Sequence, residues 1–261
     1  MTLTEIKFSE DLLDLDIEID DSTYEYNGVI VPRVTKILSA TLDSNALIKW
    51  AGNIPPSMYN NISDGAKRIG TEVHAQIDRF LNDPTNKDFF FYNNLLSSRE
   101  EDKVITALNN FKSWYYNIHD WGYKIEEIVG LEIPITCPWY GGTIDGIVKI
   151  NGAYYIIDFK TSKKIVLEHV LQTSAYMWAI NNGYTPLPHI DGIGIIRVDK
   201  AIENKYDDLF LTEVVPEQGF YINQFQRCFC SLVDSYYRSI YSENIFKEYS
   251  TNYNFTDAMT G

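Results

Sequence analysis

Asp158 and Lys160 stand two residues apart at the end of an apolar stretch, in the segment IIDFKTSKK from Ile156 to Lys164. Side chains alternate between the two faces of a β-strand, so a strand here would place both charged groups on one face. A carboxylate and an ammonium side by side form either a plain surface ion pair, which contributes little to stability, or part of a reactive site. The other polar residues of the chain decide between the two.

A second acid, Asp145, is predicted to lie directly beside Asp158. It belongs to the segment GGTIDGIVKI, which an Asn-Gly dipeptide at 151–152 joins to the strand that carries Asp158. Asn-Gly is a strong signal for a two-residue hairpin turn, and this turn pairs Ile150 with Ala153. Counting back from that pair puts Asp145 opposite Asp158, where side chains are close together. Two like charges so placed repel each other, and a divalent metal ion between them is the simplest explanation.

The same site can recruit further charged groups. Next to a metal held by two carboxylates, the Lys160 ammonium can orient an attacking water or stabilise charge on a phosphate. Glu132, in LEIPI on the preceding predicted strand, can add a carboxylate, whereas Glu126 and Glu127 compete with it for that position. An exposed strand acid is the plain alternative for Glu132.

Two predicted helices carry candidates as well. Gln172 and Tyr176 lie one turn apart on a helix expected over 166–181, so they share a face. His74 lies next to the apolar face of a helix expected over 64–81. The alternatives are that the first two residues pack their helix on the sheet and that His74 is a satisfied core histidine.

Three segments taken in order, GGTIDG, IIDFKTS and QTSAY, resemble the RecB-like branch of the PD-(D/E)XK nuclease superfamily. That branch has an acid on one strand, an Asp-x-Lys on the next and a Gln-x-x-x-Tyr helix after them. The matching residues here are Asp145, Asp158, Lys160, Gln172 and Tyr176. GTEVHAQID matches an upstream Gly-Thr-x-x-His setting, and VPRVTKILS looks like the lead-in of phage and mitochondrial members. The resemblance covers roughly residues 31–185, and the ordered set is far more specific than any one piece.

The resemblance implies a metal-dependent nuclease with Mg²⁺ or Mn²⁺ as its cofactor. In that reading Asp145, Asp158 and the backbone carbonyl of Phe159 hold the metal. His74 or Glu132 completes the ligand shell. These assignments follow from the family pattern and not from the spacing of the residues alone.

The resemblance also favours a substrate and a setting. In the family, the residues matched by Gln172 and Tyr176 face the active site and contact DNA. The branch favours an exonuclease that acts on single-stranded or frayed DNA ends in phage-type replication or recombination, with room for a replication or recombination protein as partner. Two alternatives remain: a structure-specific endonuclease or RNA-acting nuclease with the same site, and a non-catalytic module that binds nucleic acid or protein. The intact set of Asp145, Asp158 and Lys160 argues against the second.

Composition limits the function further. The chain has 36 acidic and 22 basic residues and a formal net charge of −14, which argues against a protein that coats nucleic acid nonspecifically. A local basic track is still allowed, and Lys163 and Lys164 could form part of one or simply be solvated. Three cysteines without paired spacing suggest a reducing compartment, and they cannot supply the four thiolates of the iron–sulfur cluster found in some relatives. With no membrane-length apolar run and no signal pattern, we expect a soluble, cytoplasmic protein.

The predicted elements form an α+β fold with a central mixed β-sheet flanked by helices, a restriction-endonuclease-like core with a helical N-terminal region. The expected divisions are an acidic arm (1–22), one nuclease domain (23–249) and a flexible tail (250–261). Within the domain we expect a helical part (33–120), a sheet core (121–215) and a C-terminal helix (217–249). We also expect a hairpin at Asn27-Gly28, a helix from Val34 that could continue past Trp50, a break over 53–61, and a helix over 98–118.

Overall fold

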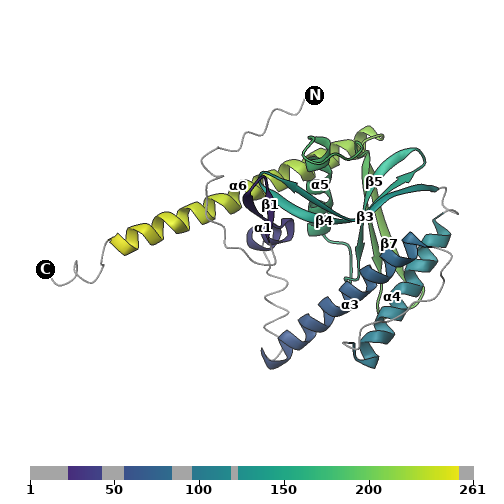
Figure 1. The fold of residues 1–261 in the computed structure, drawn as a ribbon. Helices are drawn as coiled ribbons and strands as arrows, with labels where there is room; N and C mark the ends of the chain where they lie inside the picture. Colours follow the sequence, from purple (N-terminus) through teal and green to yellow (C-terminus); the bar gives the residue numbers. More distant parts are fainter. Residues whose placement is uncertain (1–22, 43–55, 84–95, 119–122, 253–261) are drawn as a thin grey trace.

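The fold is that of a computed structural model, which describes residues 23–42, 56–83, 96–118 and 123–252 (Figure 1). Its helices are α1 (Val34–Thr41), α3 (Pro56–Asn82), α4 (Ser98–Asn117), α5 (Leu167–Asn181) and α6 (Pro216–Asn252). Its strands are β1 (Thr23–Tyr26), β2 (Val29–Pro32), β3 (Ile125–Cys137), β4 (Tyr140–Ile150), β5 (Ala153–Lys160), β6 (Gly192–Val198) and β7 (Tyr206–Thr212).

The central sheet has the strand order β3-β4-β5-β6-β7. Its strands pair antiparallel except for β5 and β6, which run parallel. A parallel pair needs a long crossover connection, and α5 supplies it between β5 and β6. The sheet is therefore mixed, and the predicted α+β fold with a helical N-terminal region is confirmed.

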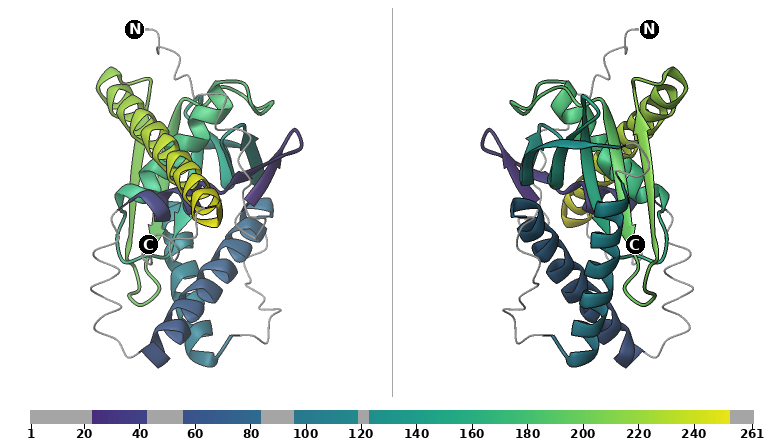
Figure 2. Two further views of the ribbon diagram at one scale, coloured as in Figure 1. Left: turned by 90° about the vertical axis from the view of Figure 1, so that its left-hand side faces the viewer. Right: turned by 90° about the vertical axis from the view of Figure 1, so that its right-hand side faces the viewer.

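Helices cover both faces of the sheet (Figures 1 and 2). On one face, α1, α5 and α6 pack in a core that includes Ile37, Leu171 and Phe229. On the other face, α3 and α4 pack in a second core that includes Val73 and Phe111. Helix α5 is apolar around most of its circumference because it lies between the sheet and α6.

The two Asn-Gly turns form as the sequence predicts. Asn27 and Gly28 have φ values of 49° and 83°, and Asn151 and Gly152 have values of 48° and 84°. Positive φ at both central residues defines the type I′ turn, whose twist matches that of the flanking strands. The second turn sets the β4–β5 register, which starts at Ile150↔Ala153 and runs to Gly146↔Ile157.

Two expectations about helix ends are wrong. Helix α1 ends at Thr41, because Leu42 is already extended, so no continuous helix runs from Val34 past Trp50. Residues 43–55 lie outside the described part. Helix α3 begins at Pro56 rather than near Asp64, within the segment expected to be a break. Proline fits the first turn of a helix, where its missing N–H would have had no partner.

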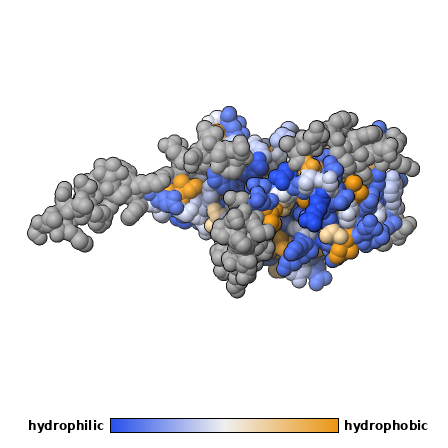
Figure 3. Space-filling model, turned by 90° about the horizontal axis from the view of Figure 1, so that it is seen from below, coloured by the Kyte–Doolittle hydropathy of each residue, from blue (hydrophilic) through white to orange (hydrophobic). Residues whose placement is uncertain are grey.

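Helix α6 also differs slightly from the prediction. It begins at Pro216 and continues to Asn252, three residues into the expected flexible tail, which starts at residue 250. The acidic arm, 1–22, and residues 253–261 lie outside the described part. Among the described helices, none combines the length and the apolar character needed to cross a membrane. On the face shown in Figure 3, hydrophilic residues predominate and hydrophobic ones lie in small separate groups.

Candidate active site

Asp158 and Lys160 lie at the carboxyl end of β5 and contact each other. The Lys160 Nζ is 2.7 Å from Asp158 Oδ1, as expected for two side chains on one strand face. Asp158 is only 3% exposed, so this is a buried pair and not a surface ion pair. The second carboxylate oxygen of Asp158, Oδ2, is buried and has no hydrogen-bond partner. A buried acceptor left in this state is costly, so this atom calls for an additional partner.

Asp145 lies on the neighbouring strand β4, at the position opposite Asp158. The regular ladder is recorded up to Gly146↔Ile157, and one step further the Phe159 N–H donates to Asp145 Oδ2 at 2.7 Å. A carboxylate thus takes the place of a strand carbonyl as the acceptor. The ladder agrees with the predicted register up to Gly146↔Ile157, and Asp145 and Asp158 are the next residues on the two strands.

The two carboxyl groups have pKa values shifted in opposite directions. Burial raises the pKa of Asp158 to about 6, and the negative charge of Asp145 adds to this, although Lys160 opposes it. Burial also disfavours the charged form of Asp145, but His74, Lys160 and the Phe159 N–H outweigh it and lower the pKa. Asp145 is therefore the acid that most readily stays ionised, and Asp158 needs additional positive charge nearby.

His74 and Glu132 join Asp145 in one cluster. Among the described residues, these three offer ligand atoms that all lie within 4.8 Å of one another. The His74 Nδ1 is 3.4 Å from Asp145 Oδ1. Asp158 does not belong to this cluster, although its Oδ2 has no partner. The helix α3 and the strands β3 and β4 thus supply the imidazole and two carboxylates.

The backbone at Glu132 is unusual. Its φ is 48°, in the left-handed region, although it lies within β3 and is not a glycine. It falls between the pairs Leu131↔Gly146 and Ile133↔Ile144, so it stands opposite Asp145. Such a conformation costs of order 1–3 kcal/mol, and strained residues of this kind cluster at active sites, ligand clamps and switch regions.

Glu126 and Glu127, the competitors for this position, lie elsewhere. Glu126 accepts a hydrogen bond from the N–H of Gly152 in the β4–β5 turn. Glu127 stands opposite Lys149 in the β3–β4 register. Of the three acids, only Glu132 is in the cluster with Asp145. Burial and the charge of Asp145 raise the pKa of Glu132.

The neighbours of His74 raise the pKa of its imidazole. Burial lowers its pKa, but the Asp145 carboxylate more than offsets this, so the net pKa is raised above the ordinary value. Its ring also packs edge-on against Phe159 at 6.5 Å between centroids. The interpretation as an ordinary core histidine does not account for its contact with Asp145.

Gln172 and Tyr176 connect to the site through Lys160. The Lys160 Nζ donates to Gln172 Oε1 at 3.3 Å, and Gln172 Nε2 donates to the Tyr176 hydroxyl at 3.0 Å. Tyr176 is buried, and burial raises its pKa, so it stays protonated. The glycine at 142 makes room for it, because a Cβ there would overlap the Tyr176 ring. These two residues hold the lysine as well as packing α5.

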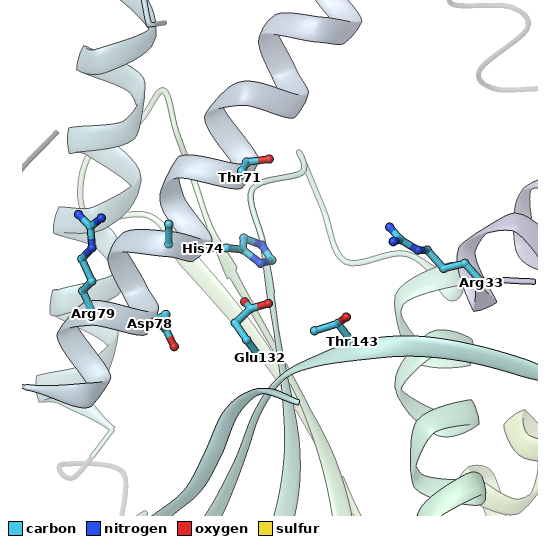
Figure 4. A pocket seen from close by; sticks show the side chains of 9 residues that line it. Arg33, Thr71, His74, Asp78, Arg79, Glu132 and Thr143 are labelled. Atoms are coloured by element: carbon cyan, nitrogen blue, oxygen red, sulfur yellow. The ribbon is translucent and has the colours of Figure 1, made fainter. Parts of the chain in front are cut away.

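An open pocket of about 710 Å³ lies over the cluster (Figure 4). Its lining residues are Arg33, Gly70, Thr71, His74, Ala75, Asp78, Arg79, Glu132 and Thr143. In Figure 4 the side chains of His74 and Glu132 approach each other, and Arg33 extends towards the pocket from the opposite side. The pocket therefore brings a cation opposite the acidic cluster.

Sequence reasoning missed Arg33. It follows β2 and forms an isolated bridge with Gly141, and its guanidinium lies 5.5 Å from the centre of the Tyr24 ring. Its Nε is buried without a hydrogen-bond partner. The only sequence signal was its place in the VPRVTKILS segment, because no periodicity links residue 33 to residues 132–160.

The residues present fit a divalent cation. The set is rich in carboxylate oxygen, which Mg²⁺ and Mn²⁺ prefer. Two observations indicate that the site needs positive charge in addition to Lys160. Asp145 and Asp158 lie near each other, and the Oδ2 of Asp158 is buried without a partner. The role predicted for the Phe159 carbonyl stays a prediction, since the recorded contact of that residue is made by its N–H.

A family model described as the PD-(D/E)XK nuclease superfamily matches residues 57–245, which is most of the chain. The chain belongs to the PD-(D/E)XK nuclease superfamily. It carries a nuclease domain, a fold that binds nucleic acid, and nucleases of this superfamily use divalent metal ions. The match covers α3, where His74 lies, and the strands that carry the three acids. The RecB-like branch and the phage-type likeness stay predictions.

Other comparisons add little to this nuclease assignment. No curated protein matches the chain significantly. Among solved structures, one described as the crystal structure of SSO0001 is 11% identical over 60% of this chain and 75% of that one, with a TM-score of 0.26. A likeness at that level carries no argument about this nuclease.

Proposed function

We propose that this nuclease is a divalent-metal-dependent deoxyribonuclease of the RecB-like branch that acts on single-stranded or frayed DNA ends. The observation that supports it most is the buried Asp158, whose free Oδ2 lies in a site shared with Asp145 and Lys160. This atom is an acceptor close to a second carboxylate, so a cation is the partner that would satisfy it. A hydrolytic site keeps it available for a cofactor.

Mg²⁺ or Mn²⁺ is the proposed cofactor, held by Asp145 and Asp158 together with the Phe159 carbonyl. Glu132 and His74 would complete the shell. When bound, such a cation supplies positive charge and Lewis acidity towards a phosphate. The strained backbone of Glu132 supports this role, since it turns the carboxylate towards Asp145 at a cost in stability.

Lys160 is proposed to position the attacking water. Burial lowers the pKa of Lys160, but the negative charges of Asp158 and Asp145 raise it by more. The net pKa lies above the ordinary value, so the ammonium stays charged. It is held from both sides, by Asp158 Oδ1 and by Gln172 Oε1, which fixes its direction. The water forms a new P–O bond as the P–O bond to the leaving nucleotide oxygen breaks. The water loses a proton, and the leaving oxygen gains one.

Arg33 is proposed to contact the scissile phosphate or its neighbour. A guanidinium matches the geometry of phosphate oxygens, and Arg33 faces the acidic cluster across the pocket. This cation would offset the repulsion between a polyanionic substrate and the acids.

The choice of an exonuclease and its setting in phage-type replication or recombination rest on the resemblance of the motifs to the RecB-like branch. The proposed cytoplasmic location rests on the three cysteines without paired spacing and on the expected absence of membrane and signal segments. Partner proteins from replication or recombination fit the same setting. The residues of the site support phosphodiester hydrolysis in general. Strand polarity and end-dependence are properties that only substrates can test.

One cleavage assay tests the proposal. The pure protein and its Asp145→Asn variant are incubated with linear single-stranded, linear duplex and closed circular DNA, and with single-stranded RNA. Each substrate is tested with EDTA, Mg²⁺ or Mn²⁺. We expect metal-dependent loss of linear DNA by wild type and no loss with the variant, which can still accept the Phe159 N–H.

The other outcomes each reject a part of the proposal. Cutting of circles makes the protein an endonuclease, and preference for RNA changes the substrate. Equal activity of the Asp145→Asn variant rejects the site. If no nucleic acid is cleaved with either metal, a module that only binds becomes the better interpretation.

A further inference from the structure

A second hollow, of about 700 Å³, lies beside the active-site pocket. Helices α3 and α4 and the loops that follow β5 and β6 contribute its walls, and we refer to it as the basic groove. Its lining residues are Asn61, Ile62, Gly65, Ala66, Arg68, Ile69, Ser97, Arg99, Glu100, Lys103, Thr161, Ser162, Lys163 and Lys200. Five of these are lysines or arginines, and one is an acid. The chain as a whole has the opposite bias, with a net charge of −14.

Most of these cations lack a partner. Arg68 is held by Glu100, with 2.7 Å between Nη2 and Oε1. Within the part of the chain that the structure describes, no carboxylate lies at ion-pair distance from the others, Arg99, Lys103, Lys163 and Lys200. Four cations thus line one groove, and among the described residues none of them forms an ion pair.

Two of these cations repel each other. Burial lowers the pKa of Lys200, the charge of Lys103 lowers it further, and Asp199 only partly offsets this. Like charges held near each other cost free energy unless an anion lies between them or nearby. The arrangement is therefore suited to a negatively charged ligand.

The segments that carry the cations are fixed by specific bonds. Arg197 Nη1 donates to the Ser162 carbonyl at 3.2 Å, next to Lys163. Asn110 Nδ2 donates to the carbonyls of Asp199 and Ile202, on either side of Lys200. Lys103 and Arg99 lie on α4, whose first turn is closed by a capping box. These hydrogen bonds hold the backbone of the segments that line the groove, so the cations keep their spacing.

The basic groove adjoins the active site along the chain and in space. Thr161, in its lining, directly follows Lys160. On α3, Ile69 lines the groove and the next residue, Gly70, lines the active-site pocket. A Cβ on Gly70 would lie 3.8 Å from the Thr161 hydroxyl oxygen. A ligand in the groove would therefore lie close to the reacting groups.

We propose that the basic groove binds consecutive backbone phosphates of the single nucleic-acid strand whose scissile bond lies in the active site. This inference rests on the proposed nuclease function and assigns it a second substrate subsite. The cations line the walls, and Ile62, which is 42% exposed, offers an apolar surface for sugars or base faces. The subsite attracts the strand locally, where the net charge of the protein would repel it.

Salt dependence of binding is the measurement that tests this subsite. The Lys103→Gln/Lys163→Gln variant removes two exposed cations from different walls of the groove. The control variant, Lys124→Gln/Arg227→Gln, makes the same change in charge at exposed positions away from the groove. Lys124 lies by the β4–β5 turn, at the opposite end of β5, and Arg227 lies on α6. Both variants should melt within a few degrees of wild type.

Binding of a fluorescent 20-nucleotide single-stranded DNA is measured by anisotropy with EDTA, so that no cleavage occurs, over a range of NaCl concentrations. Each lost phosphate contact should reduce the slope of log K against log salt by about 0.7 for a single strand. We expect the groove variant to lose about 1.4 in slope and about 25-fold in affinity at 0.1 M salt. The control variant should change the slope by less than about 0.3.

The outcomes separate the two proposals. If wild type binds and cleaves DNA while the groove and control variants bind equally well, the subsite is wrong and the nuclease function stands. If wild type neither binds nor cleaves DNA, the proposed function fails and the subsite fails with it. A selective loss of slope in the groove variant, with cleavage rate at saturating substrate kept within about threefold, supports the subsite.

Discussion

Two buried ion pairs of the same spacing lie side by side in the central sheet. Asp158 and Lys160 lie at the end of β5, and Arg197 and Asp199 lie at and just after the end of β6, the strand parallel to it. Lys160 and Arg197 are direct neighbours in the register. In the sequence, each ion pair consists of an acid and a base separated by one apolar residue. Their surroundings give them different roles.

Around Arg197, acids and bases are balanced, because Lys205 Nζ also lies 3.6 Å from Asp199 Oδ2. The Arg197 Nε is 2.5 Å from Asp207 Oδ2, and Nη1 is 3.2 Å from Asp199 Oδ2. The other oxygen of Asp199 accepts the N–H groups of Ala201 and Ile202. Only Nη2 of the guanidinium is buried without a partner. The group fixes the loops after β5 and β6, and its role is structural.

Around Asp158, the acids outnumber the bases. One ammonium, that of Lys160, lies near the acids Asp145 and Asp158, and Glu132 is close to Asp145. Asp158 Oδ2 has no partner, and the cluster borders an open pocket. An excess of acidic groups and access from solvent therefore indicate a site for a cation and a phosphate. The Asp-x-Lys spacing alone does not.

The largest expected effect follows from replacing the unpartnered acid. Asp158→Asn keeps an oxygen for Lys160 but removes a charge from the proposed metal site. A metal ion bound there would contribute several kcal/mol to stabilisation of the transition state. Cleavage of single-stranded DNA should fall by at least about 1,000-fold. The rate is measured in Mg²⁺ and Mn²⁺ on protein with an unchanged circular dichroism spectrum. Wild-type activity in this variant would make the two ion pairs equivalent.

Lys160→Ala should lower kcat by about 100-fold, as expected for loss of one charged donor at the reacting phosphate. Binding of Mn²⁺, followed by calorimetry, should change by less than about threefold, because the carboxylates remain. A variant that loses Mn²⁺ binding would contradict the role in positioning water. It would instead show that the lysine organises the ligands.

The matched change in the structural pair should affect stability instead of activity. Asp199→Asn weakens a charged hydrogen bond to Arg197, and we expect the free energy of unfolding to fall by about 2 kcal/mol. The kcat of the folded protein should stay within twofold of wild type. Urea unfolding and initial-rate assays on the same preparation check both values. A large loss of kcat without loss of stability would assign Asp199 to the active site.

The smallest effect concerns the hydroxyl behind Lys160. Tyr176→Phe removes the group that accepts from Gln172, and a lost hydrogen bond of about 1 kcal/mol should lower kcat by about fivefold. The control is Tyr140→Phe, which removes a buried hydroxyl that donates to the Ala175 carbonyl. It should lower stability by a similar amount and leave kcat unchanged. Equal kcat values in the two variants would reduce Tyr176 to a packing residue.

The sequence by itself determined the parts of the site that depend on local geometry. The Asn151-Gly152 dipeptide can adopt positive φ at both residues, so it fixed the turn and with it the β4–β5 register. Strand alternation then placed Asp145, Asp158 and Lys160 together. The one-turn spacing placed Gln172 and Tyr176 on one face of α5, where a direct hydrogen bond joins them.

Only the tertiary structure decided which distant residues complete the site. Glu132, rather than Glu126 or Glu127, joins Asp145 because the irregular β3–β4 register places it opposite Asp145, and its left-handed backbone is a state that no local sequence signal at this position indicates. Arg33 reaches the pocket because its segment bridges to β4, and the basic groove exists because α3 and α4 pack beside the loops after β5 and β6. Contacts between residues far apart in the chain depend on how whole elements pack, and side-chain periodicity describes only one element at a time.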